Sequence, residues 1–375
     1  MVSHTVISNA PKARLRVTLR VAMALVIAAT AMHLSSCASP TYYWQAASGH
    51  FALMRARQDV VEAIEQGSAD EDTLEKLRLS RDIKTFAVTE LDLPDTDSYS
   101  EFVQTGRDAV VWNVVAAPEF SLEAKTWCFP VSGCVPYRGY FDRGAAQDFA
   151  ERLAEHHLDV AVSPAIAYST LGWFDDPLLD TMWRQSEAQF AAYLFHEMAH
   201  QKLYVKGDAK FNESYASFVE AIGVERWLEQ RNAGEALENW RTLGEARSAF
   251  NRLVDQSRAE LAEIYASNAA SAAMREDKQA AFERLQTRYR RVREEQWNGR
   301  DYFGGWFERE LNNARFALFD SYEGGHCAFD RLYDEAGEDI ERFHELARAR
   351  SELPADERQK WLSQSCDEIA PTTEL

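Results

Sequence analysis

The sequence is poor in cysteine and in positive charge. It contains five cysteines in 375 residues, and no two of them form a Cys-x-x-Cys pair, so a structural zinc cluster held by thiolates is not expected. Asp and Glu outnumber Lys and Arg by 60 to 41, which gives a formal net charge of −19. A broad basic surface for phosphate backbones is therefore not expected, and nucleic acid is excluded as a partner.

The apolar segment near the N-terminus is too short to span a membrane. Residues 21–32 carry no charge and follow four basic residues, Lys12, Arg14, Arg16 and Arg20. The segment has about a dozen residues, whereas a helix needs roughly 20 to cross a bilayer. Basic residues followed by a short apolar run predict a signal peptide, which we assign to residues 1–37.

The end of this segment predicts a lipid anchor. Leu34, Ser35, Ser36 and Cys37 resemble the bacterial lipobox, in which the cysteine receives diacylglycerol and becomes the mature N-terminus. Ala38 follows in place of Asp, and in such lipoproteins this favours the outer membrane. The resemblance implies a protein of the bacterial cell envelope, lipid-anchored at Cys37 on the periplasmic face of the outer membrane.

The four other cysteines predict disulfides, because an even number in an exported chain is typical of paired thiols. Proximity in the sequence favours Cys128 with Cys134 and Cys327 with Cys366. Three connectivities are possible.

Few helix breakers interrupt the chain, and their positions predict its organisation. Residues 46–66 and 72–90 have apolar residues at helical spacing with Gly67 between them, which predicts an N-terminal helical hairpin within 38–95. Residues 109–116 and 126–141 favour strands, 144–157 a helix and 158–166 a strand. A further helix is expected to begin near Leu179, after the turn Asp175-Asp176-Pro177.

Proline is absent from residues 237–295, which contain one glycine. Two or three antiparallel helices are predicted there, within a C-terminal helical region (231–375) that packs on a core (96–230). The fold class is α+β, mostly α-helical, with a small β-sheet next to the helix near Leu179 and a C-terminal helical bundle.

One motif carries chemistry: residues 196–200 read His-Glu-Met-Ala-His, the HExxH pattern. On a helix, His196 and His200 project from one face and can bind one Zn²⁺. Glu197 lies near that face, where it can act as a general base for hydrolysis without ligating the metal.

The third ligand is expected from the next helix. Residues 212–216, Asn-Glu-Ser-Tyr-Ala, resemble the NExxA element of gluzincin metallopeptidases, which implies Glu213 as ligand. A His₂Glu set leaves the fourth position for water, as catalytic zinc requires. The interval from His200 to Glu213 is shorter than in thermolysin-like sequences. Glu220, two helical turns after Glu213, is the alternative ligand or a partner for an imidazole N–H.

Several segments together resemble a family of bacterial lipoproteins named as aminopeptidases. They are the lipobox with residues 42–45, residues 127–141, 167–178, the HExxH and NExxA segments, and 311–315. The resemblance covers nearly all of the mature chain. It implies a gluzincin-like zinc metallopeptidase that acts on peptides.

Other residues are weaker candidates. Tyr322, and less so Tyr215, have phenols that could stabilise the oxyanion of a tetrahedral intermediate. Asp175 and Asp176 could hold a peptide α-amine, although a turn and helix cap is the simpler interpretation. The strand at 158–166, which contains Pro164, could be an edge that receives an extended peptide. His344 begins a false HExxH match that Arg348 cannot complete, so an exposed helix face is expected there.

The sequence therefore predicts a zinc-dependent metallopeptidase, an aminopeptidase by resemblance, with Glu197 and Tyr322 as catalytic residues. Two alternatives remain: a zinc endopeptidase, or a catalytically silent metal-site lipoprotein that binds peptides or assists envelope assembly. An acidic group that closes one end of the cleft would favour the aminopeptidase. Retention of Glu197 argues against the silent protein.

Overall fold

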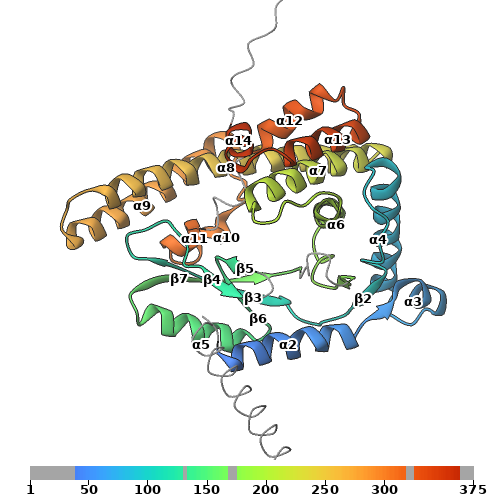
Figure 1. Cartoon of the computed structure of the whole chain (residues 1–375), viewed down its shortest axis with the longest axis horizontal. Coiled ribbons are helices and arrows are strands. Elements are labelled where there is room, and N and C mark those ends of the chain that lie inside the picture. Colours follow the sequence, from blue (N-terminus) through green and yellow to red (C-terminus); the bar gives the residue numbers. More distant parts are fainter. Residues whose placement is uncertain (1–38, 130–132, 168–174, 318–324, 364–375) are drawn as a thin grey trace, which may run out of the picture.

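The computed structural model describes residues 39–129, 133–167, 175–317 and 325–363 (Figure 1). Over these residues the chain is mostly helical with small sheets, as the α+β prediction requires. The elements are α2 (Pro40–Arg55), β1 (Gln58–Asp59), α3 (Val60–Gln66), α4 (Glu71–Glu90), β2 (Glu101–Val103), β3 (Val111–Pro118), β4 (Trp127–Phe129), β5 (Gly133–Val135), β6 (Arg138–Tyr140), α5 (Arg143–Ala154), β7 (Leu158–Ala165), β8 (Leu178–Leu179), α6 (Glu187–Lys202), α7 (Ala209–Gln230), α8 (Gly234–Ala266), α9 (Ser271–Gln296), α10 (Gly304–Phe307), α11 (Asn313–Ala317), α12 (His326–Glu335), α13 (Ile340–Ser351) and α14 (Ala355–Leu362). A search of the described helices finds none with the length and apolarity needed to span a membrane.

An antiparallel sheet with the order β6-β3-β7 lies on one side of the molecule (Figure 1). Strands β3 and β7 pair along their whole length, from Val111 opposite Ala165 to Pro118 opposite Leu158. Helix α5 covers the sheet, and Val114, Ala116 and Leu153 belong to the small core between them. The strands predicted at 109–116 and 158–166 and the helix predicted at 144–157 are confirmed.

The predicted N-terminal hairpin is only partly correct. Helix α2 ends at Arg55, and Gln58 and Asp59 pair with β2 before α3 begins. The Asp59 side chain accepts the backbone N–H of Glu62 and so caps α3. The single helix expected over 46–66 is wrong, because a capping residue in extended conformation interrupts it. Helices α3 and α4 pack together, whereas α2 packs on β6.

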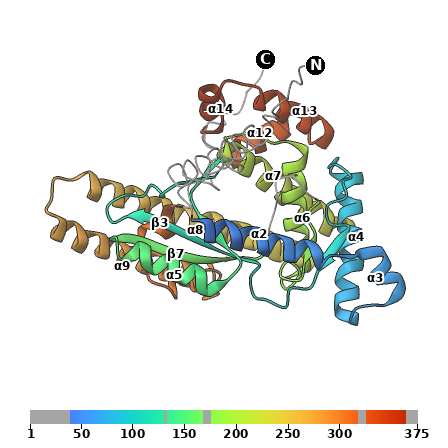
Figure 2. The same ribbon diagram turned by 60° about the horizontal axis from the view of Figure 1, so that its bottom comes forward.

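The largest core surrounds α6 and α7, which pack against each other. Helix α4 closes one side of α6, while α12, α13 and α14 cover α7 (Figure 1). The region at 237–295 forms two helices, α8 and α9, which pair with their own aromatic core and extend away from α6 (Figure 2). Of the two or three helices predicted for 237–295, the structure has two.

Candidate metal centre

Helix α6 carries the HExxH motif but begins later than predicted. Leu178 and Leu179 form β8, which pairs in parallel with β2. The helix starts at Glu187, where the Ser186 hydroxyl accepts the backbone N–H of Gln189 and caps it. Phe195, Met198 and Ala199 are buried in the core, so His196, Glu197 and His200 lie on the half-buried opposite face.

A short, tightly held loop connects α6 to α7. The Asn212 side chain accepts the backbone N–H of Val205 at 2.7 Å and donates to its carbonyl at 2.9 Å. Asp208 caps α7 by accepting the N–H of Phe211, and its other carboxylate oxygen accepts the buried Arg358 of α14 at 2.6 Å. These contacts explain how the short interval after His200 can bring Glu213 back to the motif.

Three potential ligand atoms converge between the two helices. Nε2 of His196 lies 3.2 Å from Nε2 of His200, and 3.3 Å from Oε2 of Glu213. Nε2 of His200 lies 3.7 Å from Oε1 of Glu213, and one ligand atom from each residue lies within 4.8 Å of the others. Atoms held about 2.0–2.1 Å from a tetrahedral zinc ion lie roughly 3.3 Å apart, so the donor set fits zinc in both chemistry and spacing.

Glu220 lies on the other side of His196. Its Oε2 accepts the Nδ1–H of His196 at 3.0 Å, and its Oε1 lies 3.8 Å from Nη1 of Arg247. A carboxylate in this position orients the ring and binds Nδ1, so that Nε2 is the nitrogen that faces His200 and Glu213. Of the two carboxylates considered as third ligand, Glu213 faces the Nε2 atoms and Glu220 does not.

Negative charge around the buried imidazoles makes the centre favourable for a cation. Burial opposes protonation of His196, but hydrogen bonds to Glu213 and Glu220 outweigh it and raise its pKa to about 10. Burial, together with the neighbouring His196, lowers the pKa of His200 to about 4. Burial also opposes ionisation of Glu213, yet the hydrogen bond from His196 and the proximity of both imidazoles hold its pKa below the usual range.

Comparison with known proteins identifies the family. Residues 41–362 match the family model described as "Putative aminopeptidase". The chain belongs to this family. Membership in this aminopeptidase family indicates a peptidase, and therefore a hydrolase. No curated protein and no solved structure matches the chain.

Two tyrosines that the sequence did not single out border the centre. Burial raises the pKa of Tyr137, and the charges of Glu213 and Glu197 raise it further, so its phenol stays protonated near both carboxylates. The ring of Tyr204 lies 6.4 Å from the ring of His200. Both side chains are partly exposed, at 39% and 49%. Tyr137 lies within the residues quoted for the family resemblance, the only signal that could have drawn attention to it.

The other predicted tyrosines have different outcomes. Tyr322 lies outside the described residues. Tyr215 is fully buried, and its hydroxyl donates to Nδ1 of His344 at 2.7 Å, while Nε2 of His344 donates to the Leu91 carbonyl at 2.9 Å. Tyr215 is therefore a core residue with no access to a substrate. His344 is only 5% exposed, so the exposed face expected there is wrong.

Asp175 and Asp176 lie in an irregular stretch before β8. The Asp176 carbonyl accepts the N–H of Tyr99 at 2.8 Å, and its own N–H donates to the Ser98 hydroxyl. Asp175 and Asp176 are in neither a turn nor a helix, and the element that follows is strand β8, so the helix cap expected here is wrong. Asp176 is 3% exposed, and both it and Glu197 raise the pKa of the buried Tyr99 beyond the effect of burial. Asp176 and Glu197 are therefore both close enough to Tyr99 to act on its hydroxyl.

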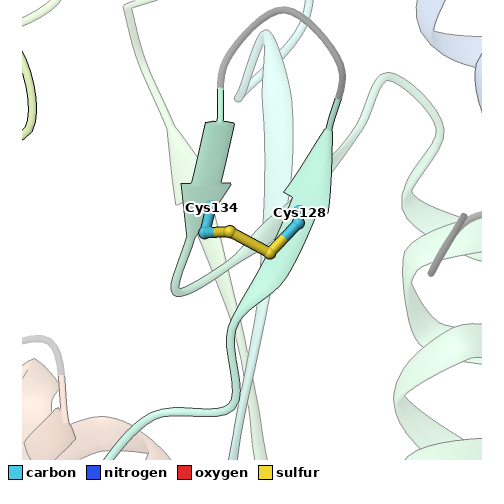
Figure 3. The surroundings of a disulfide bond; sticks show 2 residues. All are labelled: Cys128 and Cys134. Atoms are coloured by element: carbon cyan, nitrogen blue, oxygen red, sulfur yellow. A yellow bond between two sulfur atoms is a disulfide. The ribbon is translucent and has the colours of Figure 1, made fainter. Parts of the chain in front are cut away.

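A disulfide ties the hairpin that precedes Tyr137. Cys128 on β4 and Cys134 on β5 are directly opposite and bonded, as predicted (Figure 3). Cys327 is also disulfide-bonded. Its predicted partner, Cys366, lies outside the described residues.

Strand β7 is an edge strand, as expected, but other side chains already bind its outer backbone groups. The Val160 carbonyl accepts Nδ2 of Asn312 at 2.9 Å, and the Val162 carbonyl accepts Nη1 of Arg309 at 2.8 Å. An extended peptide would have to displace these contacts to pair with this stretch of the edge.

Proposed function

We propose that the protein is a zinc-dependent metallopeptidase of gluzincin-like type that acts as an aminopeptidase. One observation carries this proposal: two imidazole nitrogens and a carboxylate oxygen from His196, His200 and Glu213 converge within 4.8 Å, and Glu197 directly follows His196 in the chain. Family membership supports the peptidase class independently of that geometry.

The roles of the residues follow from their positions. His196, His200 and Glu213 would hold Zn²⁺, which when bound polarises a peptide carbonyl and lowers the pKa of water. Glu197 takes the proton of the attacking water and delivers it to the leaving amine nitrogen. Glu220 orients His196 through Nδ1. Tyr322 remains the proposed donor to the developing oxyanion.

Zinc content and cleavage measured on the same samples test this proposal. Wild type and Glu197→Gln should retain zinc and Glu213→Gln should lose it, because Glu213 is a proposed ligand and Glu197 is not. The cleavage rate of Glu197→Gln should fall by about 10²–10⁴-fold, the usual contribution of a general base. If zinc-loaded wild type cleaves no peptide, the proposed peptidase activity is wrong, and the catalytically silent metal-site lipoprotein is favoured.

A second experiment tests whether the protein is an aminopeptidase. Peptides with free and acetylated N-termini should be compared at equal concentration. An aminopeptidase binds the free α-amine and should strongly prefer the unblocked series. Equal rates on both would instead assign a zinc endopeptidase.

We also propose that the protein acts from the cell envelope, lipid-anchored at Cys37 on the periplasmic face of the outer membrane. Residues 1–37, which contain the predicted signal peptide and Cys37, lie outside the described residues, so the lipobox alone supports this location. Mass spectrometry of the mature N-terminus should find a diacylglyceryl modification on Cys37. An unmodified terminus at another residue would contradict the anchor.

A further inference from the structure

Helix α2 is fixed to the sheet by one face. The Gln45 side chain donates to the Gly139 carbonyl and accepts the N–H of Phe141, both at 3.1 Å. One turn earlier, the Tyr42 ring packs on the guanidinium of Arg138 at 4.0 Å. Tyr42 and Gln45 lie on the same side of the helix, so the orientation of α2 is set by its contacts with β6.

The opposite face of α2 exposes large apolar side chains. Trp44 is 75% exposed and Phe51 is 59% exposed, and they lie two helical turns apart on one side, with exposed Ala47 between them. Tyr43 is 36% exposed beside them. Three of the six large hydrophobic side chains exposed in the described residues therefore belong to this helix. Figure 2 brings α2 to the front of the molecule, where it lies along the surface.

The charge of α2 differs from that of the rest of the chain. The protein carries a net charge of −19, yet α2 contains no Asp or Glu, and its last turn holds Arg55. An acidic surface would be repelled by anionic headgroups, whereas this face would not be. Aromatic side chains with a basic residue at the same face are typical of helices that lie in the interface of a bilayer.

The position of α2 in the chain identifies the occupant of this face. The helix begins at Pro40, immediately after the proposed lipid anchor on Cys37, so a bilayer would lie within a few residues of its first turn. We propose that the face of Trp44, Ala47 and Phe51 lies on the phospholipid surface. In the anchored protein this second contact would orient α2, and the sheet that it contacts, relative to the membrane.

Vesicle binding without the anchor tests this contact separately from lipidation. The mature chain from residue 38 should co-sediment with vesicles of phosphatidylethanolamine and phosphatidylglycerol. Trp44→Ser/Phe51→Ser should reduce the partition coefficient by at least about tenfold, because two large apolar side chains no longer enter the interface. The matched control is Val61→Ser, which removes a 41% exposed side chain from α3 and should leave partition unchanged.

A lipid-borne quencher provides a second readout that misfolding would not imitate. The quencher should reduce part of the wild-type tryptophan emission. In Trp44→Phe this quenched component should be absent, while vesicle binding is retained. Wild type that does not sediment, or a double variant that sediments equally, would overturn the proposal. A vesicle-free dimer that the double variant abolishes would assign the face to a second copy instead. Peptide cleavage should be unchanged in these variants, so failure here is distinguishable from failure of the metal centre.

Discussion

The side chain of Asn212 satisfies both backbone hydrogen-bonding groups of Val205, at 2.7 and 2.9 Å. Asn212 is 2% exposed and directly precedes Glu213. The bonds therefore hold the loop after α6 and the start of α7 in one geometry, and with them the Glu213 carboxylate.

Asn212→Ala should weaken zinc binding by about 10–100-fold, the usual effect of removing a group that supports a ligand. The backbone groups of Val205 would lose their partners, and the first turn of α7 could shift. Competition with a chelating dye measures the affinity. Asn239→Ala, an exposed asparagine on α8, is the matched control. Unchanged affinity in Asn212→Ala would show that the loop holds without this amide.

Glu220→Gln should also reduce zinc affinity, by about tenfold, because a neutral amide supports the His196 imidazole less well than a carboxylate. Glu225→Gln, on the same helix and paired with Arg241 at the surface, should have no effect. Complete loss of zinc in Glu220→Gln would instead indicate that Glu220 is a ligand.

Tyr322 and Tyr137 are expected to affect different kinetic constants. Removal of an oxyanion donor lowers kcat by about 10²–10³-fold, which we expect for Tyr322→Phe. Tyr137 is 39% exposed at the border of the centre, where it can contact the substrate before and during the reaction, so Tyr137→Phe should mainly raise KM. Steady-state kinetics on one peptide compares the two. If Tyr137→Phe lowers kcat and Tyr322→Phe does not, the roles are exchanged.

Buried His344 should make the protein sensitive to acid. Burial lowers its pKa from 6.5 to about 4, so the unfolded chain takes up a proton before the folded chain does. The contribution of neutral His344 to stability is fully present above pH 6.5 and is lost as the pH falls from 6.5 to about 4. This loss lowers the free energy of unfolding by about 3 kcal/mol. Urea titrations at both pH values measure it.

The variant His344→Gln should be less stable at neutral pH but should lose less stability between the two pH values. Gln removes the titrating group and retains a polar side chain for Tyr215 and Leu91. The same pH dependence in wild type and variant would assign the acid sensitivity to other groups.

Local features of the sequence predicted the elements that depend on neighbouring residues. Cys128 and Cys134 pair because a short hairpin places them opposite each other. Strands β3 and β7 and helices α8 and α9 followed from composition and helical spacing. The start of α6 was missed because Leu178 and Leu179 have the same apolar character in a strand as in a helix, and their pairing with β2 is a distant contact.

The sequence by itself determined that His196 and His200 share one face of a helix, because residues four apart on a helix always do. Only the tertiary structure decided which carboxylate meets them. Glu213 and Glu220 lie on the same side of α7, and the position of that helix depends on Arg358, which contacts Asp208 across 150 residues. His344 was misjudged for the same reason: its partners, Tyr215 and Leu91, are 129 and 253 residues away. Such contacts arise from packing of the whole chain, and no local pattern encodes them.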